Sequence, residues 1–282
     1  MRDRKLRLRQ AKNRTFQVVV HFLSFLALAP LLLILWHIVS RGVRYIDWGF
    51  LTRIPTPPNE WGDGIANALV GSLVMVSMAA AVAVPLGVSA GVCLAQARPS
   101  RFVDLARLAV DVLQGMPSVV IGILLNLWVV QAMGRFSALA GGLALGVMML
   151  PLVVRGTEEV LKLVPSHLLE ASYALGVPRY RTVLKVLIPC GLPGILSAVL
   201  MGVSRVAGET APLLFTAFGN PLMETDPLKP MDALPKLIYK SACSPWPDDQ
   251  AVAWGASVVL IFVVLSTNIL SRLVIKKWSI RF

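Results

Sequence analysis

Charged side chains are scarce in this sequence. Asp, Glu, Lys and Arg make up 15% of its 282 residues, whereas hydrophobic residues make up 56%. A soluble domain carries about 25% charged residues, so this is not the composition of an ordinary soluble domain. Several apolar stretches reach the roughly 20 residues that a helix needs to cross a bilayer. The sequence therefore predicts an all-α integral membrane protein.

Residues that build cross-links and metal sites are also few. The three cysteines and three histidines are scattered and share no spacing typical of a disulfide framework or a zinc site. No Gly-Lys dipeptide occurs, which excludes the phosphate-cradling loop G-x-x-x-x-G-K-[ST]. We therefore expect no metal site and no bound cofactor. If ATP hydrolysis drives this protein, it takes place on a partner subunit.

Acidic residues are outnumbered by basic ones, 15 to 27, which gives a formal net charge of +12. Such an excess can indicate nucleic-acid binding, but here the basic residues gather at the ends of apolar runs, as the positive-inside rule explains. The basic N-terminus "MRDRKLRLRQAKNR" precedes an apolar stretch at 16–39. That stretch is too long for a signal peptide, and no A-x-A-like cleavage site follows it. We interpret it as a retained first span.

Six spans are predicted, and the Lys and Arg residues orient them. The N-terminal segment carries seven of these residues and the 155–187 loop carries five, whereas the 218–250 loop is net acidic. Both chain ends are therefore expected in the cytoplasm. The predicted organisation is a cytoplasmic N-terminus at 1–16, spans at 17–39, 66–97, 108–131, 137–154, 189–217 and 251–275, outward loops at 40–65 and 218–250, a cytoplasmic loop at 155–187 and a cytoplasmic tail at 276–282.

Small residues recur every four positions in the second span. Small side chains at this spacing let the backbones of two membrane helices approach closely. The pattern predicts a helix-packing face rather than a substrate path. Its members are Ala79, Ala83, Gly87, Gly91 and Ala95.

The third span, "DVLQGMPSVVIGILLNLW", carries polar and small residues at i, i+3 and i+4 spacing, from Asp111 to Asn126. On one continuous helix these positions share a face. Polar groups inside a membrane face the bundle interior or a water-filled path. We therefore expect Gln114 and Ser118 to line a path, while Asp111 lies near the cytoplasmic interface.

The fifth span holds two charges in the stretch "GVSRVAGETAPLLFTAF". A charged side chain at the bilayer centre costs ~2.5–3.5 kcal/mol. Arg205 and Glu209 are separated by one helical turn. A projection at 100° per residue puts both on the face that carries Gly194, Ala198 and Gly202, so that face is expected to point into protein.

The helix is also interrupted beside these charges. Pro212 removes the amide that would bond to the Gly208 carbonyl, and Thr210 adds a hydroxyl. Interrupted membrane helices point to substrate sites. Two interpretations stay open: the pair fixes helix register, or Arg205 faces a translocation path with Glu209 as its counter-charge.

The cytoplasmic loop has an ordered pattern. "VPSHLLEASYALGVPRYRTVLKVLIP" predicts two short helices, because Gly176 suits a helix C-terminus and Pro178 the first turn of the next helix. Glu170-Ala171-Ser172, Gly176 and the apolar run that ends at Pro189 keep the spacing of the EAA motif. The loop thus resembles that of permease subunits of ABC importers, with Ser in place of the third Ala. The resemblance implies that Glu170, Ala171 and Gly176 couple the chain to an ATPase subunit.

Other stretches narrow the resemblance. "SLVMVSMAAAVAVPLGVSAGVCLA", "QGMPSVVIGI" and "SRVAGETAPLLFTAFGN" are similar to the permeases of phosphate-specific ABC importers, and "GETAPL" resembles their A-type subunit. The likeness covers roughly 66–275. It implies the type I importer permease fold with a permease core at 66–275. It also implies a path for phosphate along Arg205, Glu209, Thr210, Gln114 and Ser118.

The same resemblance implies partners and a location. A homologous C-type permease, two ATP-binding subunits that hold ATP and Mg, and a soluble phosphate-binding protein outside the cytoplasm are expected. The location implied is a bacterial inner membrane, and the chain is a transporter subunit rather than an enzyme.

Other functions remain to be compared with this one. A permease for another oxyanion, such as sulfate, molybdate or phosphonate, would share the EAA motif. An intramembrane enzyme using Glu209 would need a second carboxylate, a His pair or a Ser/Lys nucleophile in membrane register, and none is visible. A passive channel would not need the coupling loop.

Overall fold

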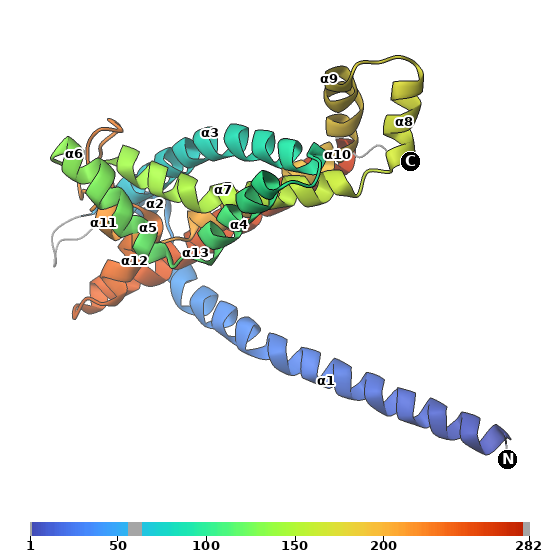
Figure 1. Ribbon diagram of the computed structural model, residues 1–282. Coiled ribbons are helices and arrows are strands. Elements are labelled where there is room, and N and C mark those ends of the chain that lie inside the picture. Colours follow the sequence, from blue (N-terminus) through green and yellow to red (C-terminus); the bar gives the residue numbers. More distant parts are fainter. Residues whose placement is uncertain (1, 56–63, 279–282) are drawn as a thin grey trace.

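The computed structural model describes residues 2–55 and 64–278, and the described chain is built of helices (Figure 1). The predicted loop 40–65 and tail 276–282 fall partly outside these residues. The main helices are α1 (Arg2–Gly42), α2 (Trp48–Thr52), α3 (Ala66–Gln96), α4 (Arg101–Gly115), α5 (Ser118–Leu125), α6 (Gln131–Met133), α7 (Ala138–Lys162), α8 (Ser166–Ala174), α9 (Arg179–Thr182), α10 (Ile188–Ala207), α11 (Ala211–Thr216), α12 (Leu234–Ala242) and α13 (Pro247–Trp278).

Helices α3 and α7 form the centre of the bundle and run parallel to each other. A Cβ atom built on Gly87 would lie 2.8 Å from the Cβ of Val153. One built on Gly91 would lie 2.6 Å from the Cβ of Thr157. Residue numbers rise together along the two helices, which defines the parallel arrangement. The small residues of α3 therefore allow its backbone to approach α7 closely.

The third span is not the single helix expected at 108–131. It consists of α4 and the segment from α5 to α6, bent by 100° at Met116–Pro117. Pro117 has no amide hydrogen and disfavours helical geometry at the preceding residue, and Met116 is extended, with φ −70° and ψ 135°. The polar positions from Asp111 to Asn126 therefore do not share one face, which corrects the expectation from helical spacing.

This bent span nevertheless crosses the bundle. Since α3 and α7 are parallel, the chain between them must return to the end where α7 begins. At the α4 end, Val103 packs with Leu94 and Val154. At the α5 end, Ile121 packs in the main core with Ala138, the first residue of α7. Among the described residues, five helices are long and apolar enough to cross a membrane, and the number is six when the bent pair is counted as one span.

The fifth span begins earlier and ends sooner than the predicted 189–217. Helix α9, a π-helical turn at Val183–Leu187 and α10 together make one span, Arg179–Ala207. It runs antiparallel to α7, because Gly194 lies against Val160 while Gly202 lies against Met149. The helix breaks at 208–210 and resumes as α11, which has Pro212 in its first turn.

Other boundaries also move. Helix α7 continues to Lys162, two turns beyond the predicted end of the fourth span at 154. The predicted outward loop 218–250 contains α12 and the start of α13. Helix α1 meets α13 where Gly42 abuts Trp254, and its remaining length projects away from the bundle (Figure 1). Its apolar side chains from Phe16 to Trp36 are largely exposed in this single chain.

Two glycine-to-alanine substitutions test the α3–α7 contact. Gly91→Ala forces a methyl group to within 2.7 Å of the Val154 carbonyl oxygen, so the helices must separate. We expect a loss of about 1–3 kcal/mol in the free energy of unfolding. Gly146→Ala is the matched control, because its Cβ would lie 3.5 Å from the Ala79 carbonyl oxygen. It should be neutral or stabilising by up to ~1 kcal/mol. Thermal or SDS unfolding of the purified protein measures both, and equal stability of the two variants would contradict close packing at Gly91.

Candidate functional site

Two charges flank the break between α10 and α11. Arg205 occupies the last turn of α10, and the Glu209 amide donates to the Val206 carbonyl at 3.2 Å. The Arg205 Nε lies 3.9 Å from the Glu209 Oε1, too far for a hydrogen bond. Their side chains are 46% and 22% exposed. The carboxylate therefore balances the guanidinium without enclosing it.

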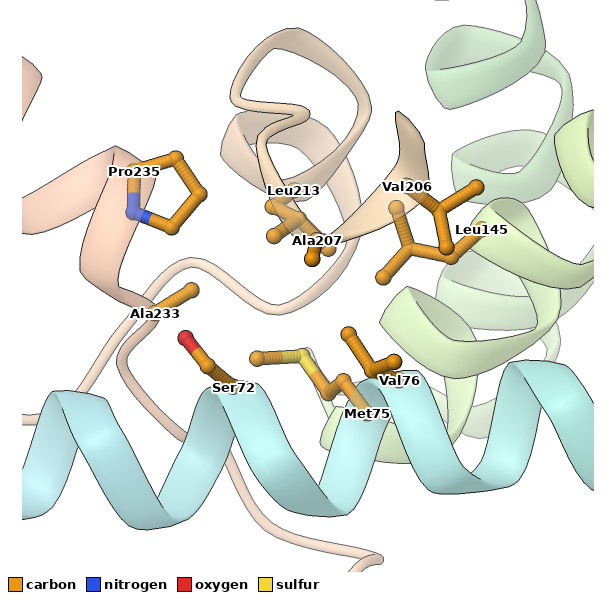
Figure 2. A pocket seen from close by; sticks show the side chains of 9 residues that line it. All are labelled: Ser72, Met75, Val76, Leu145, Val206, Ala207, Leu213, Ala233 and Pro235. Carbon is orange, nitrogen blue, oxygen red and sulfur yellow. The ribbon is translucent and has the colours of Figure 1, made fainter. Parts of the chain in front are cut away.

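A small apolar pocket lies beside this break (Figure 2). Its one polar side chain is Ser72, whose Oγ accepts a hydrogen bond from the Leu234 amide at 2.7 Å. An anion would be desolvated there without a cationic partner, so the pocket does not suit one. The lining residues are Ser72, Met75, Val76, Leu145, Val206, Ala207, Leu213, Ala233 and Pro235.

The two interrupted spans meet. A Cβ atom on Gly122 would lie 2.8 Å from the Cα of Pro212, so α5 packs directly on α11. The Asn126 side-chain amide also donates to the Phe215 carbonyl at 2.7 Å. The bend of the third span and the break of the fifth are thereby held on neighbouring elements.

The remaining predicted path residues lie at these two interruptions. Gln114 is exposed near the end of α4, and Ser118 is half-buried at the start of α5, so they flank the bend. Thr210 is half-buried and precedes the first residue of α11. The structure thus places all five predicted residues at the bend or at the break, and it brings Arg205 and Glu209 close together.

The predicted coupling loop protrudes at the end of the bundle opposite α5, α6 and α11 (Figure 1). Helix α8 is followed by Gly176 with φ +74°, a left-handed geometry that favours glycine. Glu170 and Ala171 are exposed on α8. The next residue, Ser172, is buried, and its Oγ lies 2.9 Å from the Thr182 Oγ1. The serine in the third position of the motif therefore links α8 to α9.

A buried ionic network was missed by the sequence analysis. Glu158, near the end of α7, is fully buried. Its carboxylate accepts from Lys162 Nζ at 2.6 Å, from Arg107 Nε at 2.8 Å and from Arg155 Nη1 at 3.3 Å. Arg155 is also paired with Asp111 of α4, with Nε 2.8 Å from Oδ1. Asp111 therefore belongs to this network.

A sequence signal for the network did exist. Arg155, Glu158 and Lys162 follow i, i+3 and i+4 spacing within "RGTEEVLK", as charges on one helix face do. The predicted end of the span at 154, just before the first of these charges, hid the pattern. Across the described residues, this network included, no group of three or more His, Cys, Asp or Glu side chains could hold a metal ion.

Comparisons with known proteins agree with this architecture. Residues 83–280 match the family described as "Binding-protein-dependent transport system inner membrane component". The chain is 38% identical over 277 residues to the phosphate transport system permease protein PstA of Yersinia pestis, covering 98% of this chain and 94% of that protein. It is 40% identical over 231 residues to PstA of Xylella fastidiosa strain Temecula1, covering 81% and 80%.

A solved structure shares the fold. The inward-facing MetNI methionine ABC transporter matches with a TM-score of 0.63 at 20% identity, covering 76% of this chain and 95% of that one. At this identity the likeness concerns the fold alone.

The link between α8 and α9 can be tested by a double-mutant cycle. Ser172→Ala removes one hydroxyl from a buried pair, and we expect it to lower the local stability of the loop by about 1 kcal/mol. Amide hydrogen exchange over 172–182 in the purified complex measures this. Adding Thr182→Val to Ser172→Ala should cost less than the sum of the single changes, because their shared hydrogen bond is lost only once. Strict additivity would show that the two hydroxyls do not interact.

Proposed function

The chain belongs to the family of binding-protein-dependent transport system inner membrane components, and we propose that it is the A-type permease subunit of an ABC importer that moves inorganic phosphate into the cytoplasm. The phosphate assignment is supported by the function of relatives that are 38–40% identical over most of both chains. A permease for another oxyanion would share the loop motif but has no such support.

Arg205 is the residue that we assign to phosphate. The single observation that carries this assignment is a half-exposed guanidinium at a break in a membrane span. Guanidinium donors match phosphate oxygens in paired geometry. Glu209, 3.9 Å away, offsets the positive charge when no anion is present. Conduction needs binding that is weak enough to release, which this balance provides.

The other path residues supply polar groups rather than charge. We assign Gln114 and Ser118 at the bend of the third span, and Thr210 at the break of the fifth, to the wall along which phosphate passes. Gly122 and Pro212 support this assignment, because their contact holds the two interruptions together. The surrounding helices pack closely through small residues, namely Ala83, Gly87, Gly91 and Gly202.

We assign the energy input to separate subunits that dock on the protruding loop. Glu170 and Ala171 present their side chains on the exposed surface of α8, and Gly176 sets the turn that follows. Exposed Leu163, which follows α7, and exposed Leu175, which follows α8, offer apolar contacts on either side of that helix. Because this chain lacks a phosphate-cradling loop, two ATP-binding subunits would hold ATP and Mg and carry out hydrolysis.

The remaining partners follow from the same proposal. A homologous C-type permease would complete the path on the exposed side of Arg205, and a soluble phosphate-binding protein would deliver substrate to the end that carries α11 and α12. With the coupling loop in the cytoplasm, both chain termini are cytoplasmic and the membrane is the bacterial inner membrane.

Replacing Arg205 tests the path. In proteoliposomes that contain the complete complex, Arg205→Ala should reduce labelled phosphate uptake by about 10²–10³-fold, as the loss of one oxyanion donor does. The ATPase should still respond to the loaded binding protein. Arg101→Ala, at the exposed start of α4, is the control and should leave uptake unchanged. Sulfate and phosphonate competitors should not displace phosphate. Normal uptake by an assembled Arg205→Ala complex would refute the path assignment.

Reversing a charge on the coupling loop tests the docking site. Glu170→Lys should dissociate or uncouple the ATP-binding subunits, so that less ATPase co-purifies and uptake falls together with stimulated hydrolysis. Glu159→Lys makes the same change at an exposed position of α7 and should have little effect. Affinity purification followed by ATPase assays gives both readouts. A Glu170→Lys complex that retains its ATPase subunits and its uptake would count against the coupling role.

A further inference from the structure

Glu158 holds three cations where α4 and α7 meet. Its carboxylate receives Arg107 from α4 and Arg155 and Lys162 from its own helix, α7. Asp111 of α4 balances Arg155 on the more exposed side. A buried carboxylate with several charge-assisted hydrogen bonds keeps a defined geometry, and its removal leaves the cations uncompensated.

Helix α4 is attached to its neighbours by one small apolar cluster and by this network. Val103 is its one buried side chain and packs with Leu94 and Val154, and half-buried Ala106 and Val110 of α4 pack against the same cluster. Phe102 and Leu105 point outward and are exposed. The ionic network therefore supplies the polar attachment of α4 to the cytoplasmic half of α7.

The network also connects to the coupling loop. Arg107 Nη2 donates to the Leu94 carbonyl at 3.3 Å in the last turn of α3. In the same turn, the Gln96 carbonyl accepts from Arg179, the first residue of α9. Three residues separate Lys162, the last residue of α7, from the start of α8. The ends of α3 and α7, the middle of α4 and the start of α9 thus meet at one junction, and α8 is joined to it through the short link after α7 and through the Ser172–Thr182 pair.

We propose that Glu158 is a positioning residue for transport, which fixes α4 to the cytoplasmic end of α7 so that displacement of α8 reaches the bend at Met116–Pro117. The network holds α4 at Arg107, in the middle of the helix, and at Asp111, one turn before its end. A displacement at these residues passes along the remaining turn to the point where the helix is interrupted. Gln114 lies beside that point. The transport step in this proposal rests on the proposed function, whereas the mechanical link between α8 and α4 does not.

The first test compares Glu158→Gln with Glu159→Gln in proteoliposomes. Both remove one carboxylate from adjacent positions of α7, but Glu159 is exposed. We expect Glu158→Gln to keep the stimulated ATPase while phosphate carried per ATP falls by about tenfold, within the range by which coupling residues act. Glu159→Gln should match the wild type. Equal ratios for the two variants would overturn the proposal.

A covalent replacement distinguishes positioning from other roles of Glu158. Val103 of α4 and Val154 of α7 belong to one buried cluster, so Val103→Cys with Val154→Cys places two thiols on the facing helices for oxidative cross-linking. In the Glu158→Gln background, oxidation should restore the phosphate-to-ATP ratio and reduction should abolish it again. A ratio that stays low in the oxidised complex would overturn the proposal. If Glu158→Gln does not assemble, Asp111→Asn takes its place as the test. We expect a smaller fall in the phosphate-to-ATP ratio for this variant, and an unchanged ratio would overturn the proposal.

A distance measurement needs no transported substrate. Spin labels on Leu105→Cys in α4 and His167→Cys in α8, with Cys93, Cys190 and Cys243 changed to Ser, report whether the two helices move together. The wild type and Glu159→Gln should give one narrow distribution that keeps its mean when ATP is added, whereas Glu158→Gln should give a broadened or shifted one. An unchanged distribution in Glu158→Gln would overturn the link even if phosphate proved not to be the substrate.

Discussion

The close contact between the parallel helices α3 and α7 determines how the other spans are arranged. Gly87 and Gly91 let α3 approach Val153 and Thr157 of α7 without intervening side chains. In lipid, where apolar burial gives helices no special attraction, such close packing is a main source of association. Because the two helices are parallel, the chain between them must cross the bundle a second time, and it does so through α4 and α5.

The second crossing is bent, and the segment after the bend packs against the interruption of the fifth span. Pro117 interrupts the third span, and Gly208 and Pro212 border the interruption of the fifth. The two meet because Gly122 leaves room for Pro212. Non-helical backbone at membrane depth is tolerated where it is buried in protein or lines a cavity. The interruptions thus place the polar and charged groups beside non-helical backbone instead of along one face of a continuous helix.

The charges divide into two groups with different surroundings. Arg205 and Glu209 lie 3.9 Å apart and partly exposed, so the cation stays accessible to an anion. Glu158 is fully enclosed by three cations, so its charge is committed to holding helices together. An accessible charge suits reversible binding of a ligand, whereas an enclosed charge suits the attachment of one helix to another. The first kind lies at the break of the fifth span and the second near the end of α7.

The amino-acid sequence by itself determined the features that depend on local composition and spacing. Long apolar runs required membrane helices, and Gly176 and Pro178 dictated the helix–turn–helix of the coupling loop through backbone conformation. Tertiary structure decided the rest. Pro117 predicts an interruption, but the bend of 100° and the packing of α5 against α11 are visible only in the tertiary structure. Arg155 and Lys162 are local partners of Glu158, whereas Arg107 reaches Glu158 and Asp111 reaches Arg155 from a separate helix, α4. No local pattern could pair these residues of α4 and α7, because contact between separate helices depends on how their faces pack.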